Sequence, residues 1–227
     1  MTQRPAVRFY VDYKSPYAFL AKDLARDLER EIGVAFDWLP YTLDIPAYLG
    51  SARVDDSHAV LEQNRNAHQW RRVKYSYMDC RREANRRGLT IRGTRKIFDS
   101  TLAHVGLLYA RRHDVLHAWN DRVFESFWKR ELDIEDRDAL MAVLADCGAD
   151  PKGFSSFLDG EGRAQLVAIQ REAEKAGVFG VPSFLFDDGD LYWGREHIPR
   201  VRERLVATTW RAIGTNRLRC RPLPPSD

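Results

Sequence analysis

Several features that reveal the class of a protein at once are missing from this sequence of 227 residues. Only three cysteines occur, Cys80, Cys147 and Cys220, and no two of them form a C-x-x-C pair. An odd number of widely spaced cysteines argues against a disulfide framework and against a dithiol redox centre. His113 and His117 have the spacing of a metal-binding pair, but no third ligand accompanies them, so we expect no metal site.

Long hydrophobic runs are also missing. No stretch approaches the roughly 18 apolar residues of a membrane span, and the first residues, "MTQRPAVRF", contain no apolar signal segment. Hydrophobic residues make up 44% of the chain and charged residues 30%, which is ordinary for a globular protein. We therefore expect a cytoplasmic protein without a membrane partner.

A strong net charge is absent as well, since the formal value is only +3, but the basic residues are unevenly distributed. Residues 71–96 hold ten Lys and Arg against two acidic residues, with Trp70, Tyr75 and Tyr77 nearby. Basic and aromatic residues together would suit a nucleic acid. A solvated helix face is the preferred interpretation and a pocket for a small anion the second, so we expect no nucleic-acid partner.

The two ends of the chain have alternating strand and helix patterns. The first segment predicts a strand at about 6–13, a helix at about 16–32 and a strand at about 34–39, which together form a βαβ unit. After Gly177, "VPSFLF" and "LYW" predict two short strands joined by a turn at Asp188-Gly189. A final amphipathic helix is expected at about 197–212.

The middle of the chain has a different pattern. Residues 40–57 are expected to be irregular, and almost all of 58–176 to be helical, with a long first helix that ends at Arg87. The remaining helices are predicted at these ranges: 98–112, 115–130, 136–147 and 160–176.

With the helical block removed, the order βαβ followed by ββα is that of a thioredoxin fold. We therefore predict an α/β protein of this fold with a large all-helical insertion between its halves. The predicted boundaries are a discontinuous thioredoxin-like domain, an inserted helical domain and a tail, at residues 1–45 with 177–215, 46–176 and 216–227.

One junction near the start of the chain has two interpretations. The first strand stops at Lys14, and Ser15-Pro16 then begin the first helix. Serine at the N-cap and proline at the first helical position are both favoured for local reasons. The same junction collects unpaired backbone N–H groups and the positive end of the helix dipole, so it also suits an anion. These residues alone favour the first interpretation.

Three motifs resemble a known family. The sequence reads "FYVDYKSPYAFLA" at 9–21, "KYSYMD" at 74–79 and "FGVPSFLFDDGDLYWG" at 179–194. Over about residues 7–208 it resembles the DsbA-like branch of the thioredoxin superfamily, specifically the 2-hydroxychromene-2-carboxylate isomerases and kappa-class glutathione transferases. The two end motifs are specific in combination.

The resemblance implies glutathione as the cofactor and assigns roles to several residues. Ser15 would hydrogen-bond the glutathione thiolate, with the helix dipole and Lys14 helping to lower the thiol pKa. A cis Val181-Pro182 bond would let the Val181 backbone pair with the cysteinyl unit. Lys74 would lie near the glycine carboxylate. Relatives often form dimers, so the resemblance also implies a homodimer.

The γ-glutamyl end departs from the pattern of the relatives. They carry Asp-Arg one residue after the "WG", where this chain has Glu196 and His197, with Arg195 next to them as a substitute cation. At the helix tip, Ser15 and Ala18 occupy the two cysteine positions of redox members, so disulfide exchange is not expected.

Two hypotheses follow from the sequence. The first is a glutathione-dependent isomerase or transferase acting on a small hydrophobic, aromatic substrate. The alternative is a redox-inactive DsbA-like protein with a different ligand or a binding role.

Overall fold

The computed structural model describes residues 7–57 and 59–217, with side chains up to residue 207. Cys220 lies outside this range, as does most of the predicted tail. A sheet with the strand order β2-β1-β5-β6 forms the centre, built from β1 (Val7–Val11), β2 (Asp37–Pro40), β5 (Ser183–Phe186) and β6 (Leu191–Trp193). β1 pairs in parallel with β2 and antiparallel with β5, and β5 pairs antiparallel with β6.

Two helices complete the thioredoxin fold. Helix α1 (Pro16–Ile32) connects β1 to β2, and α9 (Ile198–Arg217) follows β6 after the short turn η2 (Arg195–His197). α9 begins near the predicted residue and extends beyond the predicted end at 212. The order βαβ followed by ββα confirms the predicted fold class.

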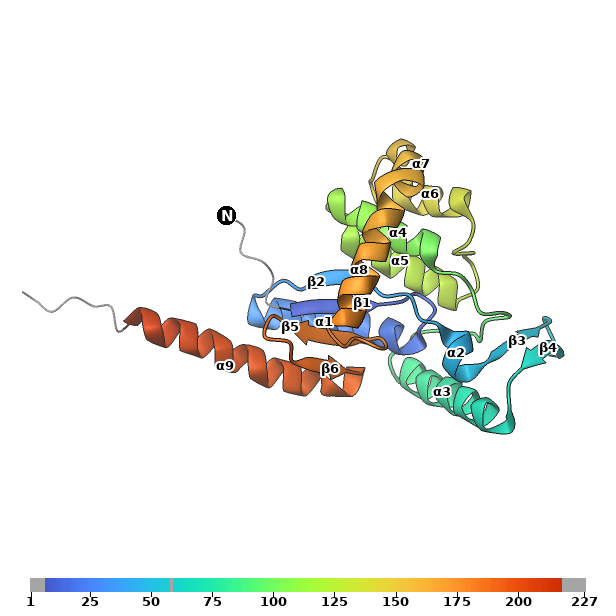
Figure 1. Cartoon of the computed structure of the whole chain (residues 1–227), viewed down its shortest axis with the longest axis horizontal. Helices are drawn as coiled ribbons and strands as arrows, with labels where there is room; N and C mark the ends of the chain where they lie inside the picture. Colours follow the sequence, from blue (N-terminus) through green and yellow to red (C-terminus); the bar gives the residue numbers. More distant parts are fainter. Residues whose placement is uncertain (1–6, 58, 218–227) are drawn as a thin grey trace, which may run out of the picture.

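The insertion between β2 and β5 contains most of the helices. It comprises α2 (Ile45–Leu49), β3 (Ser51–Val54), β4 (Val60–Asn64), α3 (Ala67–Arg86), α4 (Thr101–Arg112), α5 (Leu116–Trp128), α6 (Arg137–Asp146), α7 (Lys152–Phe157), the π-helical segment η1 (Leu158–Gly162) and α8 (Arg163–Lys175). Figure 1 shows α4 to α7 grouped above the sheet, beyond β2, and α9 below it, beside β6. α3 and the β3–β4 hairpin project beyond one end of the sheet.

Aromatic side chains join the sheet to the helices. The Phe9 ring stacks on Phe184 with centroids 4.5 Å apart and meets Trp38 edge to face at 4.6 Å, so one cluster connects β1, β2 and β5. Phe19 of α1 stacks on Phe124 of α5 at 5.8 Å. These large, fully buried rings hold α1 between the sheet and the insertion.

The β3–β4 hairpin corrects the sequence analysis, which expected residues 40–57 to be irregular and a helix from 58. Instead, β3 and β4 pair antiparallel with each other, and α3 begins only at Ala67. Asn66 starts that helix through a capping box with Gln69, in which each side chain accepts the other's backbone N–H at 2.9 Å. All five residues of β4 are exposed, so no buried alternation marked the strand in the sequence.

The boundaries of the later helices differ in smaller ways. The helix predicted at 160–176 is preceded by α7 and by η1, where Gly160 has non-helical angles. His113 ends α4 and His117 lies in α5, so the pair does not share one helix. None of the helices in the described part of the chain is long and apolar enough to cross a membrane.

Candidate functional site

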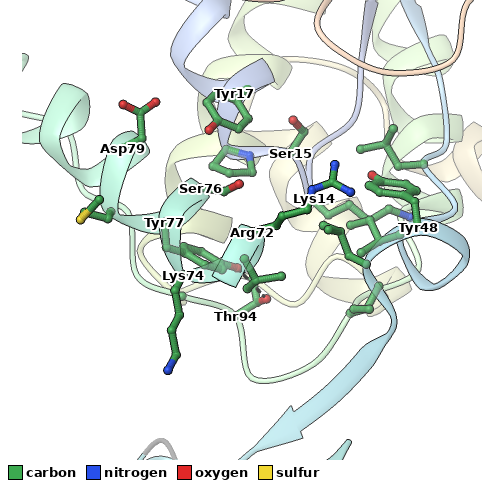
Figure 2. A pocket seen from close by; sticks show the side chains of 18 of the residues that line it. Lys14, Ser15, Tyr17, Tyr48, Arg72, Lys74, Ser76, Tyr77, Asp79 and Thr94 are labelled. Carbon is green, nitrogen blue, oxygen red and sulfur yellow. Dashed lines mark hydrogen bonds between the residues drawn. The ribbon is translucent and has the colours of Figure 1, made fainter. Parts of the chain in front are cut away.

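A cleft of about 2130 Å³ opens at one end of the sheet. The β1–α1 junction, the loop before β5, α3, the β3–β4 hairpin and the segment after β6 all contribute to its walls. The two halves of the thioredoxin fold and the insertion therefore meet around one space. Figure 2 shows the part of this cleft that surrounds Ser15.

Ser15 lies at the N-terminus of α1, where the sequence predicts it. Its backbone is extended (φ −94°, ψ 114°), and its Oγ accepts the backbone N–H of Ala18 at 3.2 Å, so the predicted N-cap is confirmed. The side chain lines the cleft and only 4% of the residue is exposed. A serine hydroxyl that accepts one hydrogen bond keeps its own proton to donate. Ser15 can therefore be both a helix cap and a donor to an anion.

The loop before β5 contains a cis Val181-Pro182 peptide bond. Both residues line the same cleft as Ser15. The carbonyl of Pro182 accepts the N–H of Gly194 at 2.8 Å, but the Val181 backbone has no hydrogen-bonding partner among the residues that the structure describes. An extended ligand can pair with such a free backbone unit as an added strand would.

Two of the other predicted site residues, Lys74 and Arg195, line the cleft but differ in what their side chains contact. Lys74 borders the cleft, but its side chain is exposed and points away from Ser15 (Figure 2). Arg195 also borders the cleft, and its guanidinium lies 3.5 Å from Asp79 Oδ2 and 3.7 Å from Glu83 Oε1. Arg195 therefore connects the segment after β6 to α3.

The two residues after Arg195 differ from each other. Glu196 lines the cleft, with its carboxylate close against the Gly194 backbone (φ 105°), where an added Cβ would lie 2.4 Å from Oε1. His197 is not among the lining residues, and its Nδ1 makes a 2.7 Å hydrogen bond with the carbonyl of Trp193. The structure thus brings six of the seven predicted residues to one cleft and leaves His197 outside it.

Three polar side chains that the sequence analysis did not assign share the cleft with Ser15: those of Tyr17, Tyr48 and Arg72. Figure 2 shows the Arg72 guanidinium directed toward Lys14 and Tyr48, the opposite direction from Lys74. Burial above all raises the pKa of the Tyr17 and Tyr48 hydroxyls to about 12 each, so both stay protonated donors at neutral pH. The Tyr17 hydroxyl points toward Ser76 of α3 (Figure 2).

The helix period offers no signal that separates Arg72 from Lys74. On an α-helix successive residues are about 100° apart, so Arg72 lies about 80° from the buried Cys80 and about 120° from the buried Ala84, whereas Lys74 lies about 120° and about 80° from them.

A buried carboxylate supports the β1–α1 junction from below. Asp12 is fully buried, and it accepts the backbone N–H of Leu43 at 2.8 Å and that of Lys14 at 3.1 Å. His104 Nε2 lies 3.4 Å from Asp12 Oδ1, while its Nδ1 is 2.8 Å from Thr42 Oγ1. Burial raises the pKa of Asp12, but His104, Lys14 and the Leu43 N–H together lower it to about 2. An ionised carboxylate thus fixes the loop that carries Ser15.

Thiols take no part in the cleft walls within the described chain. Cys80 is fully buried, and burial raises the pKa of its thiol to about 12. Burial also raises the pKa of Cys147, which lies elsewhere. A buried thiol with a raised pKa is a poor nucleophile, and Ser15 and Ala18 occupy the two places of a thioredoxin dithiol.

The cleft walls carry many more cationic than anionic groups. The basic stretch at 71–96 contributes most of them, which favours the small-anion pocket over a purely solvated helix face. The lining cations are Lys14, Arg65, Arg71, Arg72, Lys74, Arg81, Arg82, Arg95, Lys96, Arg130 and Arg195, against the acids Asp79 and Glu196.

Comparisons with known proteins agree with the thioredoxin fold of this chain. A family model described as a DSBA-like thioredoxin domain matches residues 6–206. The chain is 25% identical over 206 residues to a 2-hydroxychromene-2-carboxylate isomerase from Sphingobium xenophagum, covering 88% of this chain and 97% of the relative.

Two solved structures share the fold. The structure of a 2-hydroxychromene-2-carboxylate isomerase superposes with a TM-score of 0.69 at 19% identity, covering 92% of this chain and 98% of the other. The cytosolic disulfide reductase DsbM from Pseudomonas aeruginosa with GSH superposes with a TM-score of 0.59 at 18% identity, covering 90% of this chain and 98% of the other.

Proposed function

This chain belongs to the DSBA-like thioredoxin domain family, and we propose that it is a glutathione-dependent isomerase or transferase acting on a small hydrophobic, aromatic substrate. One observation carries the proposal: the Ser15 hydroxyl and the unpaired backbone of Val181, next to a cis-proline, line the same cleft. That pair provides a donor for a thiolate and a partner for the peptide that carries it. The relatives named as isomerases favour isomerisation within this family.

The residues take the following roles in this proposal. Ser15 donates a hydrogen bond to the glutathione sulfur, and the N-terminus of α1 adds its dipole, so the thiolate is favoured near neutral pH. Val181 and Pro182 hold the cysteinyl unit. Lys74 and Arg195 supply positive charge for the carboxylates of glutathione, and Glu196 accepts from its amine.

The reaction requires only an activated sulfur and a dry site. The thiolate adds to the β carbon of a conjugated carbonyl compound, which leaves a single bond free to rotate. Elimination of the same thiolate then restores the double bond in the other geometry, so glutathione is regenerated. Positioning the two reactants together accounts for much of the acceleration that such a site can provide.

One observation favours the alternative, a redox-inactive DsbA-like protein that binds a different ligand. Arg195 is engaged by Asp79 and Glu83, and His197 is bonded to the Trp193 carbonyl and lies outside the lining. The γ-glutamyl end of glutathione would therefore find weaker partners here than in relatives that carry Asp-Arg.

Calorimetric titration with glutathione separates the two functions. We expect binding at millimolar concentration or tighter, with proton release near pH 7 detected by repeating the titration in buffers of different ionisation enthalpy. S-methylglutathione has no thiol proton, so it should bind without that release. Absence of glutathione binding at millimolar concentration would reject the proposal in favour of the alternative.

A homodimer remains part of the proposal. The exposed hairpin carries Val60 and Leu61, which are 47% and 52% exposed, and such apolar residues on a projecting element suit a contact between subunits. Light scattering coupled to size exclusion should give twice the 26.3 kDa mass of the chain. A monomeric mass would contradict this part alone.

A further inference from the structure

Lys14 is an unusual lysine, because it is buried beside the proposed thiolate site. Its side chain is 7% exposed, although lysine is almost never buried without a partner. The Nζ atom forms an ion pair with Asp12 Oδ2 at 3.6 Å, beyond hydrogen-bond distance, and no described residue accepts a hydrogen bond from it. Lys14 lines the cleft next to Ser15. The ammonium group is therefore desolvated, with donor positions available to a ligand.

The surrounding charges hold Lys14 without using those donors. Asp12 already accepts two backbone N–H groups, and His104 lies within 3.4 Å of it. Asp99, whose pKa is lowered in part by Lys14, accepts the N–H and the hydroxyl of Thr101 at 2.9 and 2.6 Å. Both carboxylates thus stabilise the ammonium at longer range while their own acceptors are occupied.

Apolar side chains surround the space near Lys14. Leu43, Ile45 and Leu49 line the cleft from the segment after β2 and from α2, and the 41% exposed Tyr48 of α2 also lines it. Figure 2 shows Arg72 directed into the same region from α3. A hydrophobic substrate can pack here on one side of the Ser15 hydroxyl, while the Val181 backbone remains available to glutathione.

We propose that Lys14 is a catalytic residue whose ammonium group binds the substrate oxygen that becomes negatively charged when the glutathione thiolate adds to a conjugated carbonyl. This inference rests on the proposed function and names the group that acts on the second substrate.

The electrons in the proposed step balance within the two reactants. The sulfur lone pair forms a C–S bond to the β carbon, and the carbon–carbon π pair moves to form a double bond between the α carbon and the carbonyl carbon. The carbonyl π pair becomes a lone pair on the enolate oxygen. Lys14 donates a hydrogen bond to that oxygen and keeps its proton. Return of the enolate pair expels the thiolate, so no oxidant or reductant is required. A donor placed where charge develops stabilises the transition state more than the ground state.

Replacing Lys14 by methionine removes the charge and keeps the length of the side chain. With benzylideneacetone as the conjugated carbonyl probe, loss of its ultraviolet absorbance measures the addition of glutathione. We expect kcat per bound thiolate to fall about 100-fold, as after loss of one oxyanion donor, with little change in KM for the probe. The thiolate fraction is measured separately from its own absorbance, so an effect of Lys14 on the sulfur is divided out.

Lys22→Met is the matched control, since Lys22 is equally buried (4% side-chain exposure) but pairs with Asp23 and Asp121 away from the cleft. It should lower stability and leave kcat per bound thiolate unchanged. If Lys14→Met does not fold, Lys14→Gln provides the same measurement.

The inference is wrong if the Lys14 variant keeps the wild-type kcat per bound thiolate, even where its overall rate falls because less thiolate forms. This result would leave the proposed function intact, because wild-type protein would still bind glutathione and catalyse addition. A wild-type protein that does not bind glutathione would overturn both proposals, and the calorimetric titration identifies that case.

Discussion

Replacing Ser15 by alanine should raise the pKa of the bound glutathione thiol. Ser15 Oγ accepts from the Ala18 N–H at 3.2 Å, and none of the residues that the structure describes accepts the Ser15 hydroxyl proton. The alanine therefore removes one hydrogen bond to a charged sulfur, worth about 1.5–3 kcal/mol. One pKa unit corresponds to about 1.4 kcal/mol, so the expected rise is about one to two units.

The assay is a titration of ultraviolet thiolate absorbance at saturating glutathione, in wild-type protein and in Ser15→Ala. The free energy of glutathione binding should change by less than the thiol ionisation free energy, because the backbone of Val181 and the cationic walls of the cleft remain. Glutathione bound with an unchanged thiol pKa in Ser15→Ala would refute the reasoning and reduce Ser15 to a helix cap.

Loss of the cap needs its own control, because Ser15→Ala also removes the bond to Ala18 and should lower stability by about 0.5–2 kcal/mol. Asp136 caps α6 in the same way, accepting the N–H groups of Asp138 and Ala139 at 2.9 and 3.1 Å, far from the cleft walls. Asp136→Ala should therefore lower stability to a similar degree without changing the bound thiol pKa.

Three further predictions concern stability and redox chemistry. Asp12 has its pKa lowered from 3.8 to about 2, so it should contribute about 2 kcal/mol of stability at neutral pH. That contribution is fully present above about pH 4 and is lost as the pH falls through about 2, so urea unfolding should show the gap between wild type and Asp12→Asn closing over this range. Gly106→Ala should destabilise by about 1–3 kcal/mol in chemical unfolding, since its Cβ would lie 2.3 Å from the Trp119 ring; unchanged stability would mean that the ring moves freely. Insulin reduction should be undetectable, and turnover that persists after all cysteines are replaced would show chemistry that the cleft does not explain.

Local signals in the sequence predict much of this fold. Ser15-Pro16 and Gly33 bound α1 because capping depends on adjacent residues, and the structure confirms both ends. Asp136 starts α6 for the same reason. The turn through Gly189, with its positive φ of 89°, follows from glycine alone.

The missed features depend on contacts that sequence patterns do not contain. β4 is exposed along its whole length, so its pairing with β3 left no alternation of buried and exposed residues. Lys74 lies on α3 as expected, but the direction of its side chain depends on which face of α3 packs against α1. Cys80 and Ala84 are the buried residues of α3, and they set that face.

Because the burial of α3 is uneven, its two ends are held by the rest of the protein to different degrees. Its C-terminal end is anchored, since Arg87 donates to the Leu20 carbonyl at 2.6 Å and pairs with Asp23 at 3.0 Å, next to the buried Cys80 and Ala84. Its first half has no buried residue, and its contacts include Gln63 of the hairpin, which accepts from Trp70, and Tyr17 of α1, which meets Ser76. A rod fixed at one end and loosely supported at the other behaves as a cantilever, so its deflection grows toward Ala67. We therefore expect the aperture of the cleft to adjust most between α2 and the free end of α3, which would let one rigid thiolate site accept substrates of different size.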